Sequence, residues 1–376
     1  MKILIITPYA EPEKGACVVR VNAFRDYFAG HGHEVSVFAP KRSSVEVITV
    51  KRYSGILELG SLILQNKFDA IIGTSPPLTH NFFALFAAKA CGSRFLLDAK
   101  DPFTDVMKKM DPEKANSVKF KIFELMESVT HKFSDRVVFL NKPYLDNAVQ
   151  KFSLQKEKVF LAPNGSDTAK VRFDLKERRS ARREFNLGED FTFIYVGGIG
   201  DKDLGGFVKE SFPELAKKHN ARVIFILSFE GTKIQKNLLF EMQKELGKNN
   251  LTKRSEFIFN VEFEKLYKYL SAADCGLVAY PDFEMQVLGA KVFDYIAAGL
   301  PIAAKASKGN TELKNFVGKN KIGFVASNWG EFNKMFSEMR SGKRKFSREE
   351  IIKVAIANSR EKSCKKVLEE MQKVVL

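Results

Sequence analysis

Residues 2–10 read KILIITPYA, and this nearly continuous apolar run decides the fold class of the first half of the chain. A strand with one wet face alternates apolar and polar residues, whereas a strand covered on both faces of a parallel sheet stays apolar throughout. A helical stretch follows at 18–30 and stops at Gly30, a residue type that often ends helices. The pair predicts the start of a doubly wound, parallel α/β sheet.

The same alternation of strand and helix continues along the chain. In the first half the further predicted strands are 34–40, 46–53, 68–77, 93–102, 135–141 and 158–165. The pattern stops across 166–190, where LKERRSARREFNLGED is charged and holds no extended apolar run. It restarts with FTFIYVGG at 191–198 and continues with strands at 221–229, 255–261, 275–281, 301–307 and 322–327. We predict two tandem Rossmann-like domains joined near 166–190, with a last helix over 347–375.

The composition is that of a globular protein with an unusual charge. Apolar and aromatic residues make up 45% of the 376 positions and charged residues 28%, which is far from the composition of a disordered chain. No apolar run reaches the roughly 18 residues that a membrane-spanning helix needs. Four widely spaced cysteines predict reduced thiols of a cytoplasmic protein. The net charge of +16 favours an anionic partner: nucleic acid, anionic lipid or a phosphate-bearing ligand.

The strongest functional signal is the segment 274–307, DCGLVAYPDFEMQVLGAKVFDYIAAGLPIAAKAS. A strand is followed by a loop, and the loop leads through Gly289 into a helix that ends at Gly299. Amides at a helix N-terminus attract anions, and Lys291 in the first turn would strengthen that attraction. On spacing alone, Asp294 could equally well balance the helix dipole, and Lys291 could be a solvated charge.

Within this segment, KVFDYIAAGLP at 291–301 resembles the donor-site motif of family-4 glycosyltransferases, which are retaining enzymes of the GT-B fold. The chain is similar to that family at three further places, in the family's order: ITPYAEPEKGACVVRVNAFRDYFAGHGHEVSVFAP at 6–40, LAPNGSD at 161–167 and IYVGG at 194–198. The resemblance implies two Rossmann-like domains with an interdomain cleft. The expected domains are 1–167, which binds the acceptor, and 168–355, which binds a nucleotide-sugar donor. The expected C-terminal helix, 356–376, packs back on the first domain.

The resemblance also implies roles for residues around the donor. It places Asp294 on the ribose hydroxyls of the nucleotide, and Gln286 where the family has a glutamate that contacts the donor sugar. Gly198 stands where the family has an arginine that contacts the diphosphate. A lysine would then have to supply that charge, and the candidates are Lys202, Lys233 and Lys291, although lysines in a chain this basic are often only solvated.

Two glycines and one further acid complete the predicted site. Gly289 and Gly15 would let backbone amides approach a phosphate, but an ordinary turn also explains Gly15. Asp101 follows a strand where the family carries an acid near the reacting centre, so it is a second catalytic candidate beside Gln286. Capping of the following helix explains Asp101 equally well. The resemblance implies catalysis with no metal and no cofactor.

These observations predict a glycosyltransferase that moves a sugar from a nucleoside-diphosphate sugar to an acceptor hydroxyl with retention, in the synthesis of cell-surface glycans or glycolipids. Two alternatives stay open. The first is a nucleotide-sugar epimerase of the same fold, which would need an acid–base pair that the sequence does not reveal. The second is a non-catalytic polyanion-binding protein, which the charge favours. The chain shows no RNA-binding signature, so we expect no specific nucleic-acid partner.

Lysines gather in the first domain between 108 and 132. Val118, Ile122, Met126 and Val129 recur at helical spacing there and predict a buried stripe. The lysines, with Phe120 between two of them, would then mark an outer face. Such a face could rest on an anionic membrane and bring the enzyme to a glycan or lipid-linked acceptor at the cytoplasmic leaflet. A solvated face explains the lysines equally well.

Overall fold

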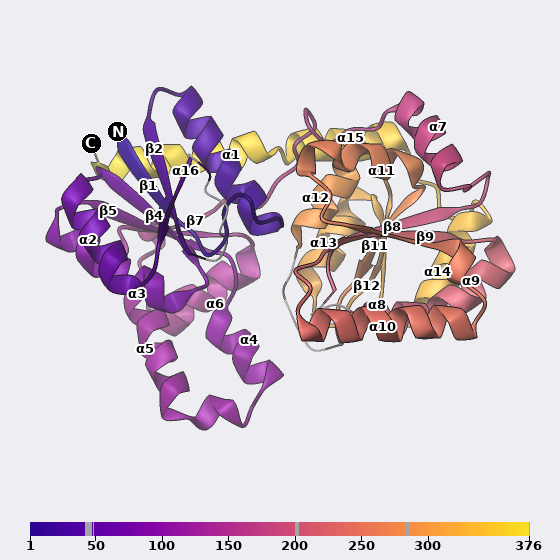
Figure 1. The fold of residues 1–376 in the computed structure, drawn as a ribbon, viewed down its shortest axis with the longest axis horizontal. Coiled ribbons are helices and arrows are strands. Elements are labelled where there is room, and N and C mark those ends of the chain that lie inside the picture. The colour runs from indigo at the N-terminus through magenta and orange to yellow at the C-terminus, as the bar shows by residue number, and fades with distance from the viewer. Residues whose placement is uncertain (42–46, 48, 200–202, 283–285, 287, 376) are drawn as a thin grey trace. The chain divides into compact units, whose positions relative to one another are not determined.

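The structure is a computed structural model that describes residues 1–41, 47, 49–199, 203–282, 286 and 288–375. The chain forms two compact units (Figure 1). Unit 1 comprises Met1–Asn164 and Arg360–Leu376, and unit 2 comprises Gly165–Ser359. The chain therefore passes between the units twice, at 164–165 and at 359–360.

Unit 1 is a parallel sheet with helices on both faces. Among the described residues its strands lie in the order β3-β2-β1-β4-β5-β6-β7, and all the pairings are parallel. The strands are β1 (Lys2–Ile6), β2 (Glu34–Pro40), β3 (Val50–Tyr53), β4 (Ala70–Ser75), β5 (Arg94–Ala99), β6 (Arg136–Phe139) and β7 (Val159–Leu161). The helices are α1 (Ala16–Gly30), α2 (Ile56–Asn66), α3 (Leu78–Ala90), α4 (Phe103–Met110), α5 (Val118–Phe133), α6 (Lys142–Phe152) and α16 (Arg360–Val375). The predicted doubly wound sheet is confirmed here.

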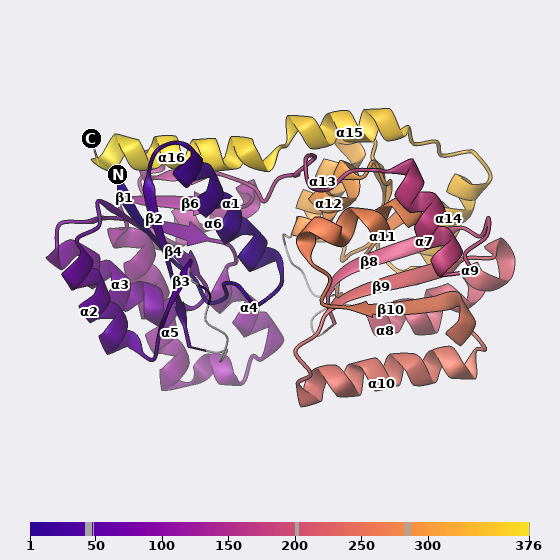
Figure 2. The same cartoon turned by 45° about the horizontal axis from the view of Figure 1, so that its top comes forward.

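Two apolar layers hold unit 1 together, one on each face of the sheet. Leu4 and Ile6 enter the layer with α2, α3 and α6, whereas Ile3 and Ile5 enter the layer with α1 and α16. Successive side chains of a strand reach opposite faces, so the continuous apolar run of β1 supplies both layers. Helix α16 comes from the far end of the chain, lies along α1 and contributes Met371 (Figure 2).

A buried ion pair joins α1 to the middle of this sheet. The side chains of Arg20 and Asp98 are 4% and 0% exposed. Two bonds run from the guanidinium to the carboxylate, from Nη2 at 2.8 Å and from Nε at 2.9 Å. The same guanidinium donates to the carbonyls of Ala162 and Pro163, which lie just before the first crossing. Such bidentate geometry satisfies both charges away from water.

Unit 2 repeats the architecture with a smaller sheet. Its described strands lie in the order β10-β9-β8-β11-β12-β13 and all the pairings are parallel, which confirms the second predicted sheet. The strands are β8 (Thr192–Gly198), β9 (Arg222–Ser228), β10 (Ser255–Phe259), β11 (Cys275–Ala279), β12 (Ile302–Lys305) and β13 (Gly323–Ala326). The helices are α7 (Leu175–Glu184), α8 (Leu204–Gly206), α9 (Phe212–His219), α10 (Lys233–Lys248), α11 (Leu266–Ala272), α12 (Ala290–Ala297), α13 (Thr311–Asn320), α14 (Trp329–Arg340) and α15 (Arg348–Ala357).

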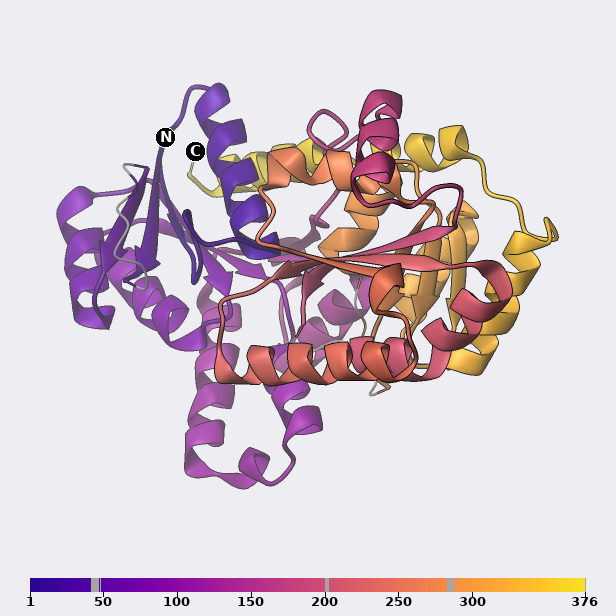
Figure 3. The ribbon, with the colours of Figure 1, turned by 45° about the vertical axis from the view of Figure 1, so that its right-hand side comes forward.

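Helices cover both faces of the unit 2 sheet (Figure 3). Helices α9, α10 and α14 pack on one face, in an aromatic layer that includes Phe193, Phe207 and Phe332. Helices α11, α12, α13 and α15 pack on the other face, around Val292 and Ile296. The sheet is therefore buried on both faces, and only its edges and the ends of its strands remain for chemistry.

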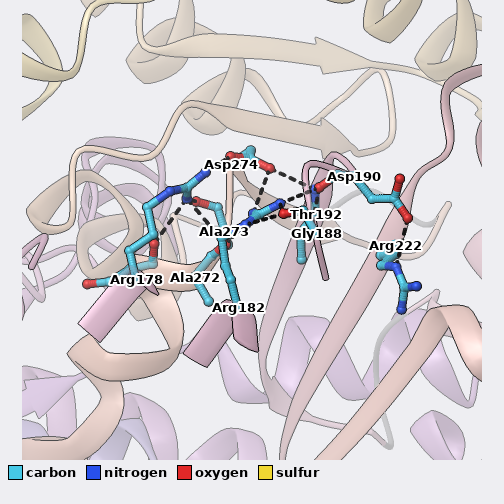
Figure 4. A network of polar contacts seen from close by, with 10 residues as sticks. Arg178, Arg182, Gly188, Asp190, Thr192, Arg222, Ala272, Ala273 and Asp274 are labelled. Carbon is cyan, nitrogen blue, oxygen red and sulfur yellow. Dashed lines mark hydrogen bonds and ion pairs between the residues drawn. The ribbon is translucent and has the colours of Figure 1, made fainter. Parts of the chain in front are cut away.

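The charged stretch predicted as the joint folds mainly as α7 of unit 2, and the crossing lies before it. Figure 4 shows how its arginines are used. Arg178 donates to the Ala273 carbonyl at 2.9 Å and to the Asp274 carboxylate at 2.7 Å, and Arg182 donates to the Ala272 carbonyl at 2.8 Å. These carbonyls end α11, where cationic side chains stabilise a helix. The arginines thus hold α7 to the amino ends of β8 and β11.

The predicted single last helix is two helices, α15 and α16, and this part of the prediction is wrong. The break falls at Asn358 and Ser359, where the chain returns to unit 1. Ser166 pairs with Ser359 as an isolated parallel bridge, and the Ser166 amide donates to the Asn358 carbonyl at 2.9 Å. Asparagine and serine compete with helical hydrogen bonding, so this dipeptide is a natural place for the break.

The predicted faces of α5 are wrong in the first half of the helix, although its lysines are exposed as expected. Phe120, expected outside, is 2% exposed, whereas Val118 and Ile122, expected in the core, are 75% and 46% exposed. The inward face carries Glu127, which accepts from Thr104 of α4 and from Lys151 of α6. Helices α4 and α5 extend away from the sheet of unit 1, and the first half of α5 has an exposed outer side (Figure 1). No helix in the described part of the chain is long and apolar enough to cross a membrane.

The Arg20–Asp98 pair gives a direct test of unit 1. Arg20→Met would leave the Asp98 carboxylate buried without its partner, and we expect this to lower the free energy of unfolding by about 3–5 kcal/mol. Lys142→Met, which removes the exposed Lys142–Asp146 pair, should cost less than about 0.5 kcal/mol. Urea denaturation of both variants measures the difference. Equal midpoints would show that the buried pair does not hold the unit together.

Candidate functional site

Open parallel sheets bind ligands at the carboxyl ends of their strands. In unit 2 the relevant ends are those of β8, β11 and β12. These strands are neighbours in the sheet, and α12 begins after the loop that leaves β11. The loop ends at Gly289, the residue before the helix. The Gly289 amide donates to the Tyr280 hydroxyl at 3.0 Å, and a Cβ atom on Gly289 would lie 2.4 Å from that oxygen. Only glycine allows this contact, which fixes where α12 begins.

Tyr295 anchors α12 to the two central strands. Its hydroxyl accepts a hydrogen bond from the Val196 amide of β8 at 2.9 Å and donates to the Leu277 carbonyl of β11 at 3.1 Å. Burial raises the pKa of this phenol well above 10, so it stays neutral. Gly276 leaves the space for the ring, because a Cβ atom there would lie 2.2 Å from a ring carbon. The first turn of α12 is therefore held firmly at the ends of the strands.

Lys291 is a buried cation at this edge, with 9% of the residue exposed. Its Nζ atom lies 3.9 Å from the centre of the Tyr195 ring, a distance at which an aromatic face attracts a cation. The same atom lies 3.0 Å from the position that a Cβ on Gly197 would take. Gly197 has φ +143°, a conformation that side chains disfavour. The ammonium thus lies against Gly197, the first of the two glycines that end β8.

Asp294 lies in the same helix and is 7% exposed. Every residue from Lys291 to Ala297 is buried, so Asp294 does not lie on an exposed face of the helix. A carboxylate in such a place is costly unless polar groups or cations surround it. An acid that only balanced the helix dipole would be exposed in the first turn, whereas Asp294 is buried.

Gln286 has a structural use in the described part of its loop. Its side-chain amide donates to the Gly309 carbonyl, and its oxygen accepts from the Thr311 hydroxyl at 3.0 Å and from the Glu312 amide at 3.2 Å. The residue therefore ties the loop before α12 to the start of α13. Its predicted catalytic role is not tested by these contacts.

The other predicted donor residues are scattered. Gly198 ends β8 beside Gly197, and no heavy atom lies within 4 Å of the position of its Cβ. Lys233 is the first residue of α10, which follows β9, and it is exposed. It takes no part in the contacts of Tyr280, Lys291 and Tyr295 described above. Lys202 lies outside the described residues.

Unit 1 carries its own candidates at the carboxyl ends of its strands. Gly15 precedes α1 with φ +122° and open space around it, which suits the close approach of a ligand. Asp101 is exposed and follows β5. Between them, the Lys100 ammonium donates to Cys17 Sγ at 3.0 Å in the first turn of α1. The first turn of α1 and the end of β5 are therefore in contact.

The sequence reasoning missed four residues at the edge of unit 2. Tyr195, Tyr280 and Tyr295 position α12 and Lys291, and Lys305 forms a buried ion-pair network at the end of β12. Tyrosines at strand ends were a usable signal, because a buried phenol needs a hydrogen-bond partner. In the described residues, no group of three or more His, Cys, Asp and Glu side chains could hold a metal ion.

The glycine pair gives a matched test of this geometry. Gly197→Ala would place a methyl group 3.0 Å from the Lys291 ammonium at a strained φ, and we expect a loss of about 1–3 kcal/mol in the free energy of unfolding. Gly198→Ala meets open space and should change it by less than about 0.5 kcal/mol. Thermal melting of the two variants checks the order. Equal stability would contradict the packing of Lys291 over Gly197.

No family model and no curated protein sequence matches the chain. Solved structures do match over nearly its whole length. Anabaena HepE, solved with UDP and with UDP-glucose, is 14% identical, with 99% of this chain and 100% of that chain covered and TM-scores of 0.75 and 0.73. A sucrose-phosphate synthase from Thermosynechococcus elongatus is 13% identical, with 100% and 99% covered and a TM-score of 0.78.

A third similar structure is WaaG, a glycosyltransferase involved in lipopolysaccharide biosynthesis. It is 13% identical, with 97% of this chain and 98% of that chain covered and a TM-score of 0.75. The parallel sheets of seven and six strands agree with this likeness in the described residues. The chain therefore has the GT-B fold of these glycosyltransferases.

Proposed function

We propose that the protein is a glycosyltransferase that uses a nucleoside-diphosphate sugar as donor. The observation that carries the proposal is the buried start of α12, which presents backbone amides and Lys291 at the carboxyl edge of the unit 2 sheet, with the buried Asp294 in the following turn. Helix N-termini at that edge are suited to phosphate groups. HepE, which shares the fold, was solved with UDP and with UDP-glucose, and this supports a donor of the same class.

The chemistry proposed is displacement of the nucleoside diphosphate from the anomeric carbon by an acceptor hydroxyl. Negative charge develops on the departing diphosphate, and the Lys291 ammonium with the amides at the start of α12 would stabilise it. In the family this charge is also stabilised by an arginine, which is replaced by Gly198 in this chain. Lys233, exposed at the start of α10, is a weaker candidate for the same work.

We propose retention of the anomeric configuration. On a front-face path the acceptor hydroxyl approaches from the side that the diphosphate leaves, and the departing phosphate oxygen takes its proton. The bond from carbon to the phosphate oxygen breaks as the bond to the acceptor oxygen forms, and no protein nucleophile is needed. Asp101 would orient the acceptor hydroxyl, and Gln286, already bonded to the start of α13, would hold the loop beside the donor sugar.

Asp294 is assigned to the ribose of the donor. A carboxylate can accept two hydrogen bonds from neighbouring hydroxyls, and bonds to a charged group contribute roughly 1.5–3 kcal/mol. Asp294→Asn keeps the shape, and we expect it to weaken the binding of a nucleoside diphosphate by about one to two decades. Asp190→Asn, at the amino end of the same sheet, should leave the affinity unchanged. Calorimetric titration with the nucleoside diphosphates measures both variants.

Product analysis separates the function from its alternatives. A glycosyltransferase releases nucleoside diphosphate when acceptor is added, whereas an epimerase returns a new nucleotide sugar. A non-catalytic polyanion-binding protein would bind heparin or nucleic acid and do neither.

An unchanged affinity in Asp294→Asn, with a lowered melting temperature, would remove this residue from the donor site and leave it a purely structural role.

We also propose that unit 1 meets an anionic membrane through an apolar and basic face, at the cytoplasmic leaflet where a lipid-linked acceptor would lie. We define the arm face as seven exposed residues of α4 and α5: Met110, Val118, Ile122 and Leu125 with Lys109, Lys119 and Lys121. The exposed apolar side chains can enter the headgroup region, and each lysine near the surface adds about 1 kcal/mol. The exposure of Val118 and Ile122 strengthens this proposal, because it places apolar side chains outward beside the lysines.

The arm face is tested by sedimentation with vesicles. We expect the native protein to bind vesicles of phosphatidylglycerol and phosphatidylcholine at physiological salt, and a variant with Ile122→Ser and Leu125→Ser to bind several-fold less. Ile234→Ser, which removes a side chain 70% exposed on α10 of unit 2, is the matched control and should bind as the native protein does. Native protein that stays in the supernatant would end the membrane proposal.

A further inference from the structure

A buried lysine lies at the end of β12 in unit 2, beside the proposed donor site. Lys305 is 2% exposed. Its ammonium contacts Asp203 Oδ2 at 2.7 Å and also Asp282 Oδ1, and it donates to the Tyr280 carbonyl at 3.4 Å. An ammonium has three protons to donate, so these three acceptors match its capacity. The side chain is therefore fully used within the protein.

The charge of Lys305 is maintained despite its burial. Burial lowers the pKa of the ammonium, but the hydrogen bonds and charges of Asp203 and Asp282 more than offset this effect, so the pKa is raised. The side chain is thus a cation at neutral pH. A buried cation with two carboxylates holds those carboxylates in place, because separating them would leave the charge unpaired away from water.

Asp203 extends the network to the start of α8 and to α14. Its carboxylate accepts from the Gly206 amide at 3.2 Å and from the Trp329 indole at 3.0 Å, and its own amide donates to the Ala279 carbonyl at 3.2 Å. A Cβ atom on Gly206 would lie 2.3 Å from the carboxylate, so the packing there is tight. The Asp203 carboxylate is therefore engaged in an ion pair and in two further hydrogen bonds.

The three charged partners come from the ends of three neighbouring strands. Asp203 follows β8, Asp282 follows β11 and Lys305 ends β12, and these strands adjoin in that order. Gly197, which lies under Lys291, is near the end of β8. Tyr280 follows β11, and its hydroxyl accepts from the Gly289 amide at the start of α12. One ammonium thus joins Asp203 and Asp282, which follow the two strands next to the proposed diphosphate site.

We propose that Lys305 is a positioning residue for donor binding, acting through Asp203 and Asp282 and touching no donor atom itself. This inference rests on the proposed function of the same site. Without the ammonium, Asp203 and Asp282 would lose their common partner and the Tyr280 carbonyl a donor. Tyr280 also bonds to the Gly289 amide, so the start of α12 would be held less firmly when the diphosphate binds. Preorganised charges and amides bind because they need no rearrangement when the ligand arrives.

The chain supplies its own reporter for this network. Trp329 is the one tryptophan among the 376 residues, and its indole donates to Asp203. Its fluorescence therefore reports the surroundings of the Asp203 carboxylate. We expect a saturating nucleoside diphosphate to change the emission of the native protein, and Lys305→Met to shift the emission before any ligand is added.

The test compares Lys305→Met with the native protein and with Arg182→Met, which breaks the network at the amino ends of β8 and β11 (Figure 4). UDP and the other nucleoside diphosphates are titrated into each by calorimetry, with melting curves alongside. We expect both variants to melt lower, but only Lys305→Met to bind the diphosphate at least fivefold more weakly. Lys305→Arg, which keeps the cation, should recover part of the affinity.

The outcomes are separable. If the native protein binds no nucleoside diphosphate, the proposed function itself fails. If the native protein binds and Lys305→Met binds equally well, Lys305 is only structural and the inference is overturned. Should Lys305→Met not fold, Asp282→Asn replaces it, because that carboxylate is 82% exposed and its loss leaves Asp203 on the ammonium. A twofold or greater loss of affinity in Asp282→Asn would support the inference, and native affinity would overturn it.

Discussion

The attachment of α12 to the ends of two strands is the constraint on which the candidate site depends. The Tyr295 hydroxyl uses both its hydrogen-bonding capacities, one on β8 and one on β11, inside a core that water does not reach. A buried phenol that lost either partner would leave a strand amide or carbonyl unsatisfied. The helix start is therefore fixed relative to the sheet, and the place of Lys291 over Tyr195 and Gly197 follows from it.

The charged residues of this basic chain do more structural work than its composition suggests. In unit 1, Arg20 holds α1 to the sheet through Asp98. In unit 2, Arg178 and Arg182 hold α7 at one end of the sheet, and Lys305 holds the segments at the other. The net charge of +16 pointed to an anionic partner, but some of the cations serve the interior. Charge at the surface has to be read from the structure, because burial and pairing decide which cations a ligand can meet.

Helix α5 shows what helical periodicity alone cannot predict. Two sets of side chains recur on α5 at helical spacing, one with Val118 and Ile122 and the other with Phe120 and Glu127. Spacing identifies both faces but does not say which one packs inward. A polar contact decided it: Glu127 lies inward because Thr104 and Lys151 satisfy it, and burial raises the pKa of that carboxyl despite these partners. The apolar residues were left on the outside.

The sequence by itself determined the fold class, because the central strands are short apolar runs buried on both faces and most strands are followed by a helix. It also located the start of α12, since Gly289 and the charged first turn are local features. Only the tertiary structure decided which side chains gather there. Lys291 is buried at the edge of the sheet, Lys233 is exposed on α10, and Lys305 is paired with acids that follow two other strands. Those contacts join residues tens to more than a hundred positions apart. They arise from the order of strands in the sheet, which no local pattern encodes.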